Sequence, residues 1–547
     1  MNLDISNMKS WSLRLGLIFS FLFPSFLATA QSTSGTSPLL LGFIGFLVFI
    51  LLVIIVLVAD RLLQITAKQV GADKDGVNYS VFPKMKEIFT TRFPDYLSNQ
   101  TVHNLDKGYD IPLEGDAEGV VEGSAATYAV KPTDFVGLSP IPKVTVEVGS
   151  KVKAGDTVFF DKKKPEIKYA APVSGEVVEV NRGAKRRITE VVILADKDQV
   201  SRDYDNIDVS NASREDLVAF LLESGAWPFI RQRPYNVVAD PNETPVNIFV
   251  STFDSAPLAP DADLLVKGNE AAFQAGINLL AQLTDGGVHV GLNGNGDAAP
   301  ADAFINVANA TTHWFRGAHP AGNVGVQIHH VAPINKDEVI WTADVQSVIT
   351  LGRLVSEGKF DTSRLVAVTG AELENPTYVK THQGANIKNF VAGLKQDHVR
   401  YILGDVLTGS ETTEKGYLGF FDDQVTVVKE GDYNELFGWL VPIAARPSLS
   451  NTFPHFAYPD KFVADTNTHG EKRAFVVTGQ YEKVLPMDIY PQHLMKAILV
   501  NDFERMEGLG IYELVEEDVA LCEFACTSKM NLQEILRDGL DALREQG

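Results

Sequence analysis

The stretch VEVGSKVKAGDTVFFDKKKPEIKYAAPVSGEVVEV, residues Val146–Val180, contains two half-motifs of similar design. The first half is VEVGSKVKAGD and the second is APVSGEVVEV, and each has short β-branched runs broken by glycine. Glycine supplies the backbone angles that tight turns need, and valine fills the half-buried face of a pleated strand. The stretch therefore predicts a small, quasi-symmetric β-sandwich. By itself it indicates a fold element and no activity.

The paired half-motifs resemble the barrel-sandwich hybrid of biotinyl and lipoyl domains, in which a modified lysine sits on a tight hairpin between the halves. Lys162, Lys163 and Lys164 fall at that place in this chain. A carrier lysine needs an isolated, protruding hairpin, and three adjacent lysines before Pro165 do not supply one. We interpret these lysines as a solvated basic turn.

Length and composition limit the class of protein. A chain of 547 residues is too long for a single core, so we expect about two to four domains. The hydrophobic content of 45% is typical of a globular protein, and the net charge of −22 argues against nucleic-acid binding through bulk charge. Two cysteines, Cys522 and Cys526, can neither form a disulfide framework nor supply the ligands of an iron–sulfur cluster. We interpret them as packed free thiols one helical turn apart, with a redox pair as the alternative.

The amino-terminal region carries membrane signals, because no charged residue lies between Leu15 and Ala59. Residues 1–30 combine a basic start, a short apolar run and small residues, which is typical of a signal peptide or a first membrane segment. Residues 31–60 are long and apolar enough to predict a transmembrane helix. The basic residues before the first segment and after the second predict that everything beyond residue 60 lies in the cytoplasm. This prediction holds whether or not the chain is cleaved after Ala30.

The rest of the chain changes its pattern several times, which predicts a multidomain α+β protein. Strands expected at Val246–Ser251, Val288–Leu292 and Leu365–Gly370 alternate with helices expected at Gly268–Leu283 and Asp344–Glu357. This alternation favours a Rossmann-like layer with a largely parallel sheet. The expected divisions are a polar tether at 61–104, the barrel-sandwich hybrid at 105–200, the Rossmann-like α/β domain at 201–395, a small β-rich domain of β-grasp or SLBB-like type at 396–455, and a largely helical domain at 456–547.

Two segments carry residues that could contact a ligand. SGAWPFIRQRPYN brings together Trp227, Phe229, Arg231 and Arg233, and aromatic rings beside arginines can hold a planar or anionic ligand. The same residue types also seal domain interfaces, and the sequence leaves both interpretations open.

The second segment, GAHPAGNVGVQIHH, contains His319, His329 and His330. A metal site usually adds a carboxylate or thiolate to such histidines. We therefore predict no metal here but a turn-rich loop with hydrogen-bonded histidines; a polar loop that faces a ligand is the alternative.

Several motifs together resemble the A-subunit family of the sodium-translocating NADH:quinone reductase, a bacterial respiratory pump. The resemblance runs in order over about residues 103–547. The matching motifs are DFVGLSP, DKKKPEIKYAAPVSGEVVEVNRGAKR, WPFIRQRPYNVV, AHPAGNVGVQIHH, GYLGFFDDQVTVV, YEKVLPMDIYP and EEDVALCEFAC. The first hundred residues lie outside the usual pattern and add a membrane anchor to a protein that the family holds peripherally on the cytoplasmic face.

The family is similar to the C-subunit of the Rnf electron-transport complex and, more distantly, to the flavin-bearing subunit of complex I. Those relatives have a glycine-rich nucleotide loop and iron–sulfur cysteines. Here SGAWPFIRQRPYN stands at the position of that loop, and only Cys522 and Cys526 remain of the cysteines. Bulky side chains block the close approach of phosphate to the backbone. The resemblance therefore implies a cofactor-free subunit, with NADH, the flavins and the iron–sulfur centre bound by other subunits.

The resemblance also implies contact with the quinone-side membrane protein of the complex, its B-subunit, at the bacterial inner membrane, and a role in quinone access or in assembly of the complex. A quinone head needs an aromatic face and one or two donors. We therefore predict quinone-adjacent positions at Trp227, Phe229, Arg231, Arg233, His319 and His330, and no catalytic or metal-binding residue.

Two alternatives remain for the function. An Rnf-type subunit that oxidises NADH would need the missing glycines and cysteines. A lipoyl-like membrane-fusion adaptor of an efflux pump would need long heptad hairpins between the half-motifs, and fewer than thirty residues separate them here.

Overall fold

The computed structural model describes residues 38–69, 94–98, 100–205, 207–438, 445–449 and 459–546. The chain divides into two compact units, Met1–Phe93 and Pro94–Gly547, which are treated separately below. The signal-like segment expected at residues 1–30 and most of the expected tether, residues 70–93, lie outside the described residues.

The first unit contains the helix α2 (Pro38–Gln69). Its window Phe43–Asp60 has a mean hydropathy of 3.1 and is, by length and composition, able to cross a membrane. The helix continues beyond the expected end at residue 60 and takes up the first part of the expected tether. This extension has a simple cause, since the segment RLLQITAKQ contains neither glycine nor proline.

The predicted sandwich lies in the second unit as two small sheets packed face to face. The core between them includes Phe159, Val177 and Ile193. Gly175 belongs to this arrangement because a Cβ atom there would collide with the backbone carbonyl of Leu194. The first sheet has the order β3 (Thr127–Val130), β9 (Ile188–Ala195), β8 (Gly175–Arg182) and β5 (Lys151–Val152). The second has the order β4 (Lys143–Val144), β6 (Thr157–Phe160) and β7 (Lys168–Ala170).

The lysine turn follows β6. Lys162 and Lys163 are exposed, while the Lys164 ammonium lies 2.5 Å from an Asp240 carboxylate oxygen. The turn is therefore solvated as predicted, except that its last lysine is tied to the α/β layer.

The α/β layer is built on a seven-stranded sheet with helices on both faces. Five strands are parallel, and β10 and β11 continue the sheet antiparallel. The strand order is β1 (Val102–Asn104), β14 (Thr311–Arg316), β13 (Val288–Asn293), β12 (Asn247–Ser251), β15 (Ile340–Thr342), β10 (Arg231–Arg233) and β11 (Val237–Val238). The helices are α4 (Arg214–Ser224), α5 (Ala262–Val266), α6 (Glu270–Ala281), α7 (Asp302–Ile305), α8 (Val324–Val331) and α9 (Val345–Glu357).

The expected strands and helices between residues 246 and 357 are thus present. The tether prediction is wrong for residues 102–104, which form the edge strand β1 and pair with β14. A three-residue strand of mixed polarity has no periodicity that a sequence pattern could reveal.

A separate six-stranded sheet follows. Its order is β19 (Ser410–Thr412), β18 (Val399–Leu403), β20 (Gln424–Lys429), β16 (Ser363–Thr369), β17 (Thr377–His382) and β2 (Val120–Glu122). The expected strand at Leu365–Gly370 is β16, but it belongs to this sheet and not to the Rossmann-like layer. The division at residue 395 is therefore wrong, because β16 and β17 already pair with the later strands. The cause is the short connection from β16 to β17: it can close an antiparallel hairpin but is too short for a parallel crossover.

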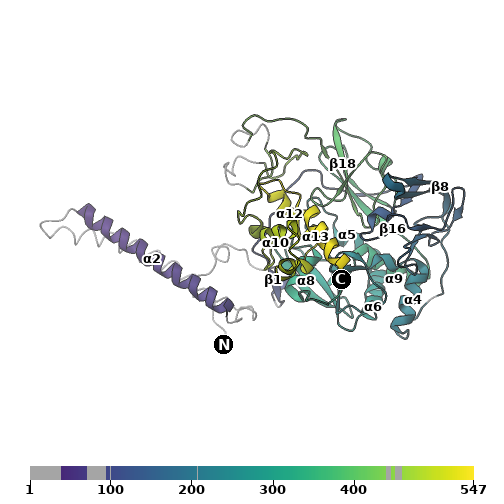
Figure 1. Ribbon diagram of the computed structural model, residues 1–547, viewed down its shortest axis with the longest axis horizontal. Helices are drawn as coiled ribbons and strands as arrows, with labels where there is room; N and C mark the ends of the chain where they lie inside the picture. Colours follow the sequence, from purple (N-terminus) through teal and green to yellow (C-terminus); the bar gives the residue numbers. More distant parts are fainter. Residues whose placement is uncertain are drawn as a thin grey trace. The chain divides into compact units, whose positions relative to one another are not determined.

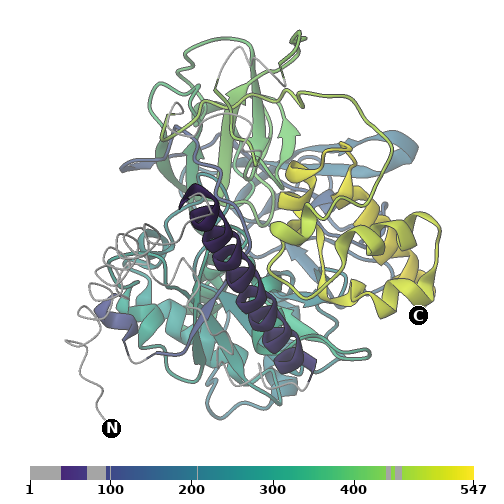
Figure 2. The ribbon, with the colours of Figure 1, turned by 90° about the vertical axis from the view of Figure 1, so that its left-hand side faces the viewer.

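The chain ends in the predicted helical region, with α10 (Pro491–Leu499), α11 (Phe503–Gly508), α12 (Glu516–Ala525) and α13 (Leu532–Gln546). Figure 1 shows α10, α12 and α13 gathered together, and Figure 2 shows the same yellow helices as a group beside the green strands. Their apolar residues form a hydrophobic core of their own, which includes Leu494, Met506 and Leu536.

Candidate functional site

The connections of the seven-stranded sheet reverse direction between β12 and β15. From β12 the chain moves outward to β13 and β14, and it then returns to the other side of β12 as β15. Open α/β sheets bind their ligands outside the carboxyl ends of the strands at such a reversal. A cavity of about 170 Å³ lies at this position, and Thr252 and Ala343, the residues that follow the two strands, line it.

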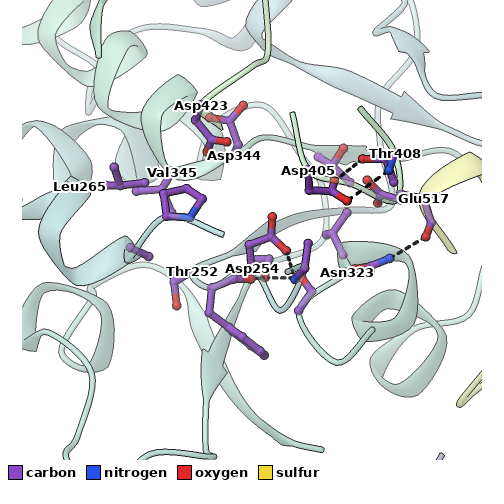
Figure 3. Close-up of a pocket in the computed structure, with 18 of the residues that line it drawn as sticks. Thr252, Asp254, Leu265, Asn323, Asp344, Val345, Asp405, Thr408, Asp423 and Glu517 are labelled. Atoms are coloured by element: carbon purple, nitrogen blue, oxygen red, sulfur yellow. Dashed lines mark hydrogen bonds between the residues drawn. The ribbon is translucent and has the colours of Figure 1, made fainter. Parts of the chain in front are cut away.

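The cavity wall is strongly acidic, and we call this space the acidic cavity. Five carboxyl side chains line it: Asp254, Asp344, Asp405, Asp423 and Glu517. Figure 3 shows Asp344 beside Asp423 on one wall and Asp405 with Thr408 on another, with Asp254 between them. The residues come from the sheet edge, from the second sheet and from α12, so three parts of the fold build one site.

Two of these carboxyl groups have pKa values close to neutral pH. Burial, together with the nearby Asp405, raises the pKa of Asp254 to about 7, although its side chain is accessible from the cavity. Burial also raises the pKa of Asp423 to about 8, with further contributions from Asp254 and Asp344. Burial is the main cause of both shifts, and repulsion between close carboxylates adds to it.

Arg231 and His319, two residues singled out in the sequence, line this cavity. The Arg231 guanidinium lies 4.8 Å from the centre of the Phe421 ring. His319 is only 3% exposed, and its Nδ1 lies 3.1 Å from Ser255 Oγ. Its Nε2 is buried and has no hydrogen-bond partner among the described residues. Burial lowers the pKa of His319, so the imidazole is neutral at pH 7.

Trp227, Phe229 and Arg233 do not line the cavity. The Trp227 indole N–H donates to the carbonyl of Ala239 at 2.7 Å, and Phe229 packs 4.8 Å from the Phe420 ring. All three side chains are buried, so the packing interpretation that the sequence left open describes their contacts.

Arg233 connects β10 to the carboxy-terminal helices. Its guanidinium donates to Asp518 at 2.9 Å and to Glu517 at 2.5 Å, and its side chain is 2% exposed. Gly325 of α8 allows this contact, because a Cβ atom there would collide with both Asp518 and Arg233. A fully buried arginine that spans two domains acts as a structural clamp.

His330 lies elsewhere, at the carboxy-terminal end of α8. The loop expected for this segment is wrong over residues 324–331, which are helical. Apolar residues at helical spacing, Val324, Ile328 and Val331, explain the helix, and Ile328 packs on Phe249 of β12.

His330 belongs to a row of imidazoles, which we call the histidine face: His103, His289, His313 and His330. The ring centres of His103 lie 6.2 Å from His313 and 6.1 Å from His330. His289 Nδ1 lies 2.9 Å from His313 Nε2. Burial lowers the pKa of each of the four, to about 4 for His313, so all are neutral at pH 7.

The hydrogen bonds assign the protons along this row. Asn247 Oδ1 accepts from the Gly287 amide, so His289 Nε2–H donates to the same oxygen and His289 Nδ1 must accept. His313 Nε2–H is then the donor to His289, and His313 Nδ1 keeps a lone pair. His330 Nε2–H donates to the Pro486 carbonyl at 2.8 Å, which likewise leaves Nδ1 with a lone pair. Neither ring nitrogen of His103 has a hydrogen-bond partner in the described part of the chain.

Comparison with known proteins identifies the family. Three family models match: the NqrA N-terminal barrel-sandwich hybrid domain over residues 103–196, the NqrA second alpha/beta domain over 212–360, and the NQRA C-terminal domain over 365–414. Curated relatives named as the A-subunit of the Na(+)-translocating NADH-quinone reductase are 37% identical in Psychromonas ingrahamii and 38% identical in Serratia proteamaculans. Each match covers 81% of this chain and 99% of the relative. The chain belongs to this NqrA family.

A solved NAD+-reducing [NiFe]-hydrogenase in the air-oxidised state is also similar, with 12% identity and a TM-score of 0.31 over 61% of this chain and 68% of that chain. A likeness this weak carries no argument.

The match to the NqrA family begins at residue 103, so the helix α2 lies before it. Among the residues that the structure describes, no group of three or more histidine, cysteine or acidic side chains could hold a metal ion. Cys522 in α12 and Cys526, which caps the carboxy-terminal end of that helix, are free and buried. Cys526 Sγ accepts from the Tyr481 hydroxyl at 2.8 Å, and burial raises the pKa of Cys522.

The sequence of this NqrA-family chain did not lead us to predict the carboxyl groups of the acidic cavity as site residues. A signal was present, because the aspartates of VSTFD, WTAD and YILGD stand just beyond the ends of strands. Aspartate at a strand end is also common in turns, so only the shared cavity distinguishes these positions.

Proposed function

We propose that this chain is a cofactor-free subunit of a respiratory sodium-pumping NADH:quinone oxidoreductase. It contributes to assembly and to quinone access, while the other subunits hold the flavins, the iron–sulfur centre and the NADH site. The names of the relatives support the complex, and one structural observation supports the cofactor-free role. The position where a nucleotide would bind is the acidic cavity, whose carboxylates repel phosphate and whose volume of about 170 Å³ is small for a dinucleotide.

The chain alone should therefore bind neither flavin nor NADH. The full-length chain purified in detergent is expected to show no stoichiometric flavin absorbance and no micromolar NADH binding by calorimetry. An Rnf-type subunit would show both, so either signal would reject the cofactor-free role.

We propose further that α2 anchors the chain in the bacterial inner membrane, next to the quinone-side membrane protein (the B-subunit), with the residues beyond 60 in the cytoplasm. Arg61 and Lys68, at the carboxy-terminal end of α2, support this orientation because basic residues favour the cytoplasmic side. A fusion after residue 100 should be active with green fluorescent protein and inactive with alkaline phosphatase. The reverse pattern would place the body of the chain outside.

For the quinone contact we propose the histidine face. His103 carries an N–H that has no partner among the described residues, and this N–H can donate to a quinone carbonyl. His313 and His330 keep lone pairs that can accept from quinol hydroxyl groups. Of the six positions predicted from the sequence, this contact uses only His330. Arg231 and His319 belong to the acidic cavity, and the three buried residues act by packing.

His330→Ala should raise the quinone KM of the assembled complex about three- to tenfold, the range expected for losing one hydrogen bond of about 1 kcal/mol. The kcat should change little, since electron delivery comes from other subunits. His398→Ala is the control, because His398 is exposed and pairs only with Asp432. Arg231→Ala in the same assay tests whether the acidic cavity contacts the quinone instead. The quinone KM should stay unchanged in this variant. An unchanged KM for His330→Ala in a normally assembled complex would remove the histidine face from the quinone contact.

A further inference from the structure

The acidic cavity has no role so far beyond repelling phosphate. Its carboxylates differ in how many hydrogen bonds the chain already makes to them. The carboxylates of Asp344 and Asp405 are already held by their own loops: Asp344 accepts from Ser347, and Asp405 accepts from Leu407 and Thr408. Asp254 accepts from the Ala256 amide, at 2.8 Å, and no hydrogen bond to the Asp423 carboxylate is found among the described residues. These two carboxylates come from the edge of one sheet and the edge of the other. Four aspartates from different loops converge on space that the chain itself leaves open.

An independent observation at this space is a buried polar atom that has no partner in the described part of the chain. His319 lines the cavity, is only 3% exposed, and has no partner for Nε2 among the described residues. Buried polar atoms in folded proteins are nearly always hydrogen-bonded. In the tautomer in which Nδ1–H donates to Ser255 Oγ, Nε2 presents a lone pair. A ligand with N–H donors would satisfy both this nitrogen and the carboxylates.

Part of the cavity wall is apolar. Pro260, Ala262, Leu265 and Val345 line it, and Figure 3 shows Leu265 and Val345 on the side away from Asp405. A hydrated metal ion gains nothing from an apolar wall, and among the described residues no group of three or more histidine, cysteine or acidic side chains could hold a metal ion. A volume of about 170 Å³ also exceeds what a bare ion needs but suits a molecule of a few non-hydrogen atoms.

We propose that the acidic cavity binds a small alkylammonium cation, with the ammonium group between Asp254 and Asp423 and the carbon chain against Leu265 and Val345. The three N–H donors of a primary ammonium point in different directions, which matches carboxylates on separate walls. A charge-assisted hydrogen bond to a carboxylate is about twice as strong as a neutral one. This proposal does not depend on the quinone contact.

Binding should strengthen as the pH rises. The raised pKa values of Asp254 and Asp423, about 7 and 8, mean that protons compete with the cation at pH 6 and are displaced by pH 8.5. The amine itself, with a pKa near that of lysine at about 10.4, stays charged over this range. The titratable and charged groups that face the site are Asp254, His319, Asp344, Asp405, Asp423, Glu517 and Arg231.

The test is calorimetric titration of the full-length chain in detergent with ethylammonium chloride at constant ionic strength. We expect saturable binding at one site, at least tenfold tighter at pH 8.5 than at pH 6. Tetramethylammonium has the same charge but no N–H donor, and Na+ has no carbon, so both should bind at least tenfold more weakly. Equal binding of either one would overturn the proposal in favour of simple charge attraction or of a metal ion.

Variants locate the site. Asp254→Asn should weaken ethylammonium binding at least tenfold, whereas Glu471→Gln, at an exposed carboxylate outside the cavity, should leave it unchanged. If Asp254→Asn fails to fold, the comparison of the three cations on the unmodified chain still decides. Absence of ethylammonium binding at pH 8.5, or equal loss in both variants, would reject the site without affecting the cofactor-free role.

Discussion

Replacing Arg233 with alanine should destabilise the chain by about 3–5 kcal/mol, the usual cost of breaking a buried ion pair by removing one partner. The Arg233 side chain is 2% exposed and that of Asp518 is fully buried, so the remaining carboxylate would have neither water nor a counter-ion. The measurement is the shift of the urea or thermal unfolding transition of the full-length chain.

The effect should depend on pH. Burial raises the pKa of Asp518 even though Arg233 opposes that shift, so loss of the guanidinium raises the pKa further. An acid whose pKa is higher in the folded state binds protons on folding, so folding of the variant weakens as the pH rises. The difference between variant and wild type should therefore be smaller at pH 5 than at pH 8.

Two comparisons make this result specific. Arg505→Ala breaks an exposed pair with Asp502 and should cost about 0–1 kcal/mol. The double replacement Arg233→Met with Asp518→Leu removes both charges and should recover at least half of the lost stability. A loss for Arg233→Ala no larger than that for Arg505→Ala would mean that the clamp contributes little.

Replacing Gly352 with alanine should destabilise the α/β layer by about 1–3 kcal/mol. Helix propensity alone predicts the opposite sign, a gain of about 1 kcal/mol for Gly→Ala inside a helix. Packing decides the outcome, because a Cβ atom at position 352 of α9 would collide with the backbone carbonyl of Ala272 in α6. Gly276 of α6 approaches the backbone of Val348 in the same way, so the two helices touch backbone to backbone.

The matched control is Gly508→Ala at the end of α11, where no atom lies within 4 Å of the new Cβ position. This replacement should change the free energy of unfolding by less than about 0.5 kcal/mol. If Gly352→Ala leaves the unfolding transition of the α/β layer unchanged or raises it, the close helix crossing is not a determinant of stability.

Much of the local structure could be predicted because it depends on short-range chemistry. Ser213 caps α4 with a reciprocal hydrogen-bond pair to Asp216, and Asp344 caps α9, as their positions before apolar helical patterns indicate. Glycine turns and valine runs predicted the sandwich for the same reason. Membership of the NqrA family was also readable from the motifs themselves.

Pairing partners could not be predicted, since they depend on residues far apart in the chain. β16 has the same apolar pattern as β12, yet it joins the second sheet because β17 returns beside it at once. β1 is too short and too polar to be recognised, and the strand it pairs with, β14, lies more than two hundred residues later.

The candidate sites divide in the same way. The residue types of the ligand-facing segments were visible in the sequence, but only the tertiary structure separates Trp227 and Arg233, which are held by buried partners, from Arg231, which faces a cavity. The sequence by itself determined the family, the sandwich, the apolar helix and most helices, because each is written in contiguous residues. The acidic cavity and the histidine face were decided by folding alone. Each site consists of side chains from strands that lie far apart in the sequence. Folding brings these strands to one edge or one face of a sheet, and no local sequence pattern shows that they will become neighbours.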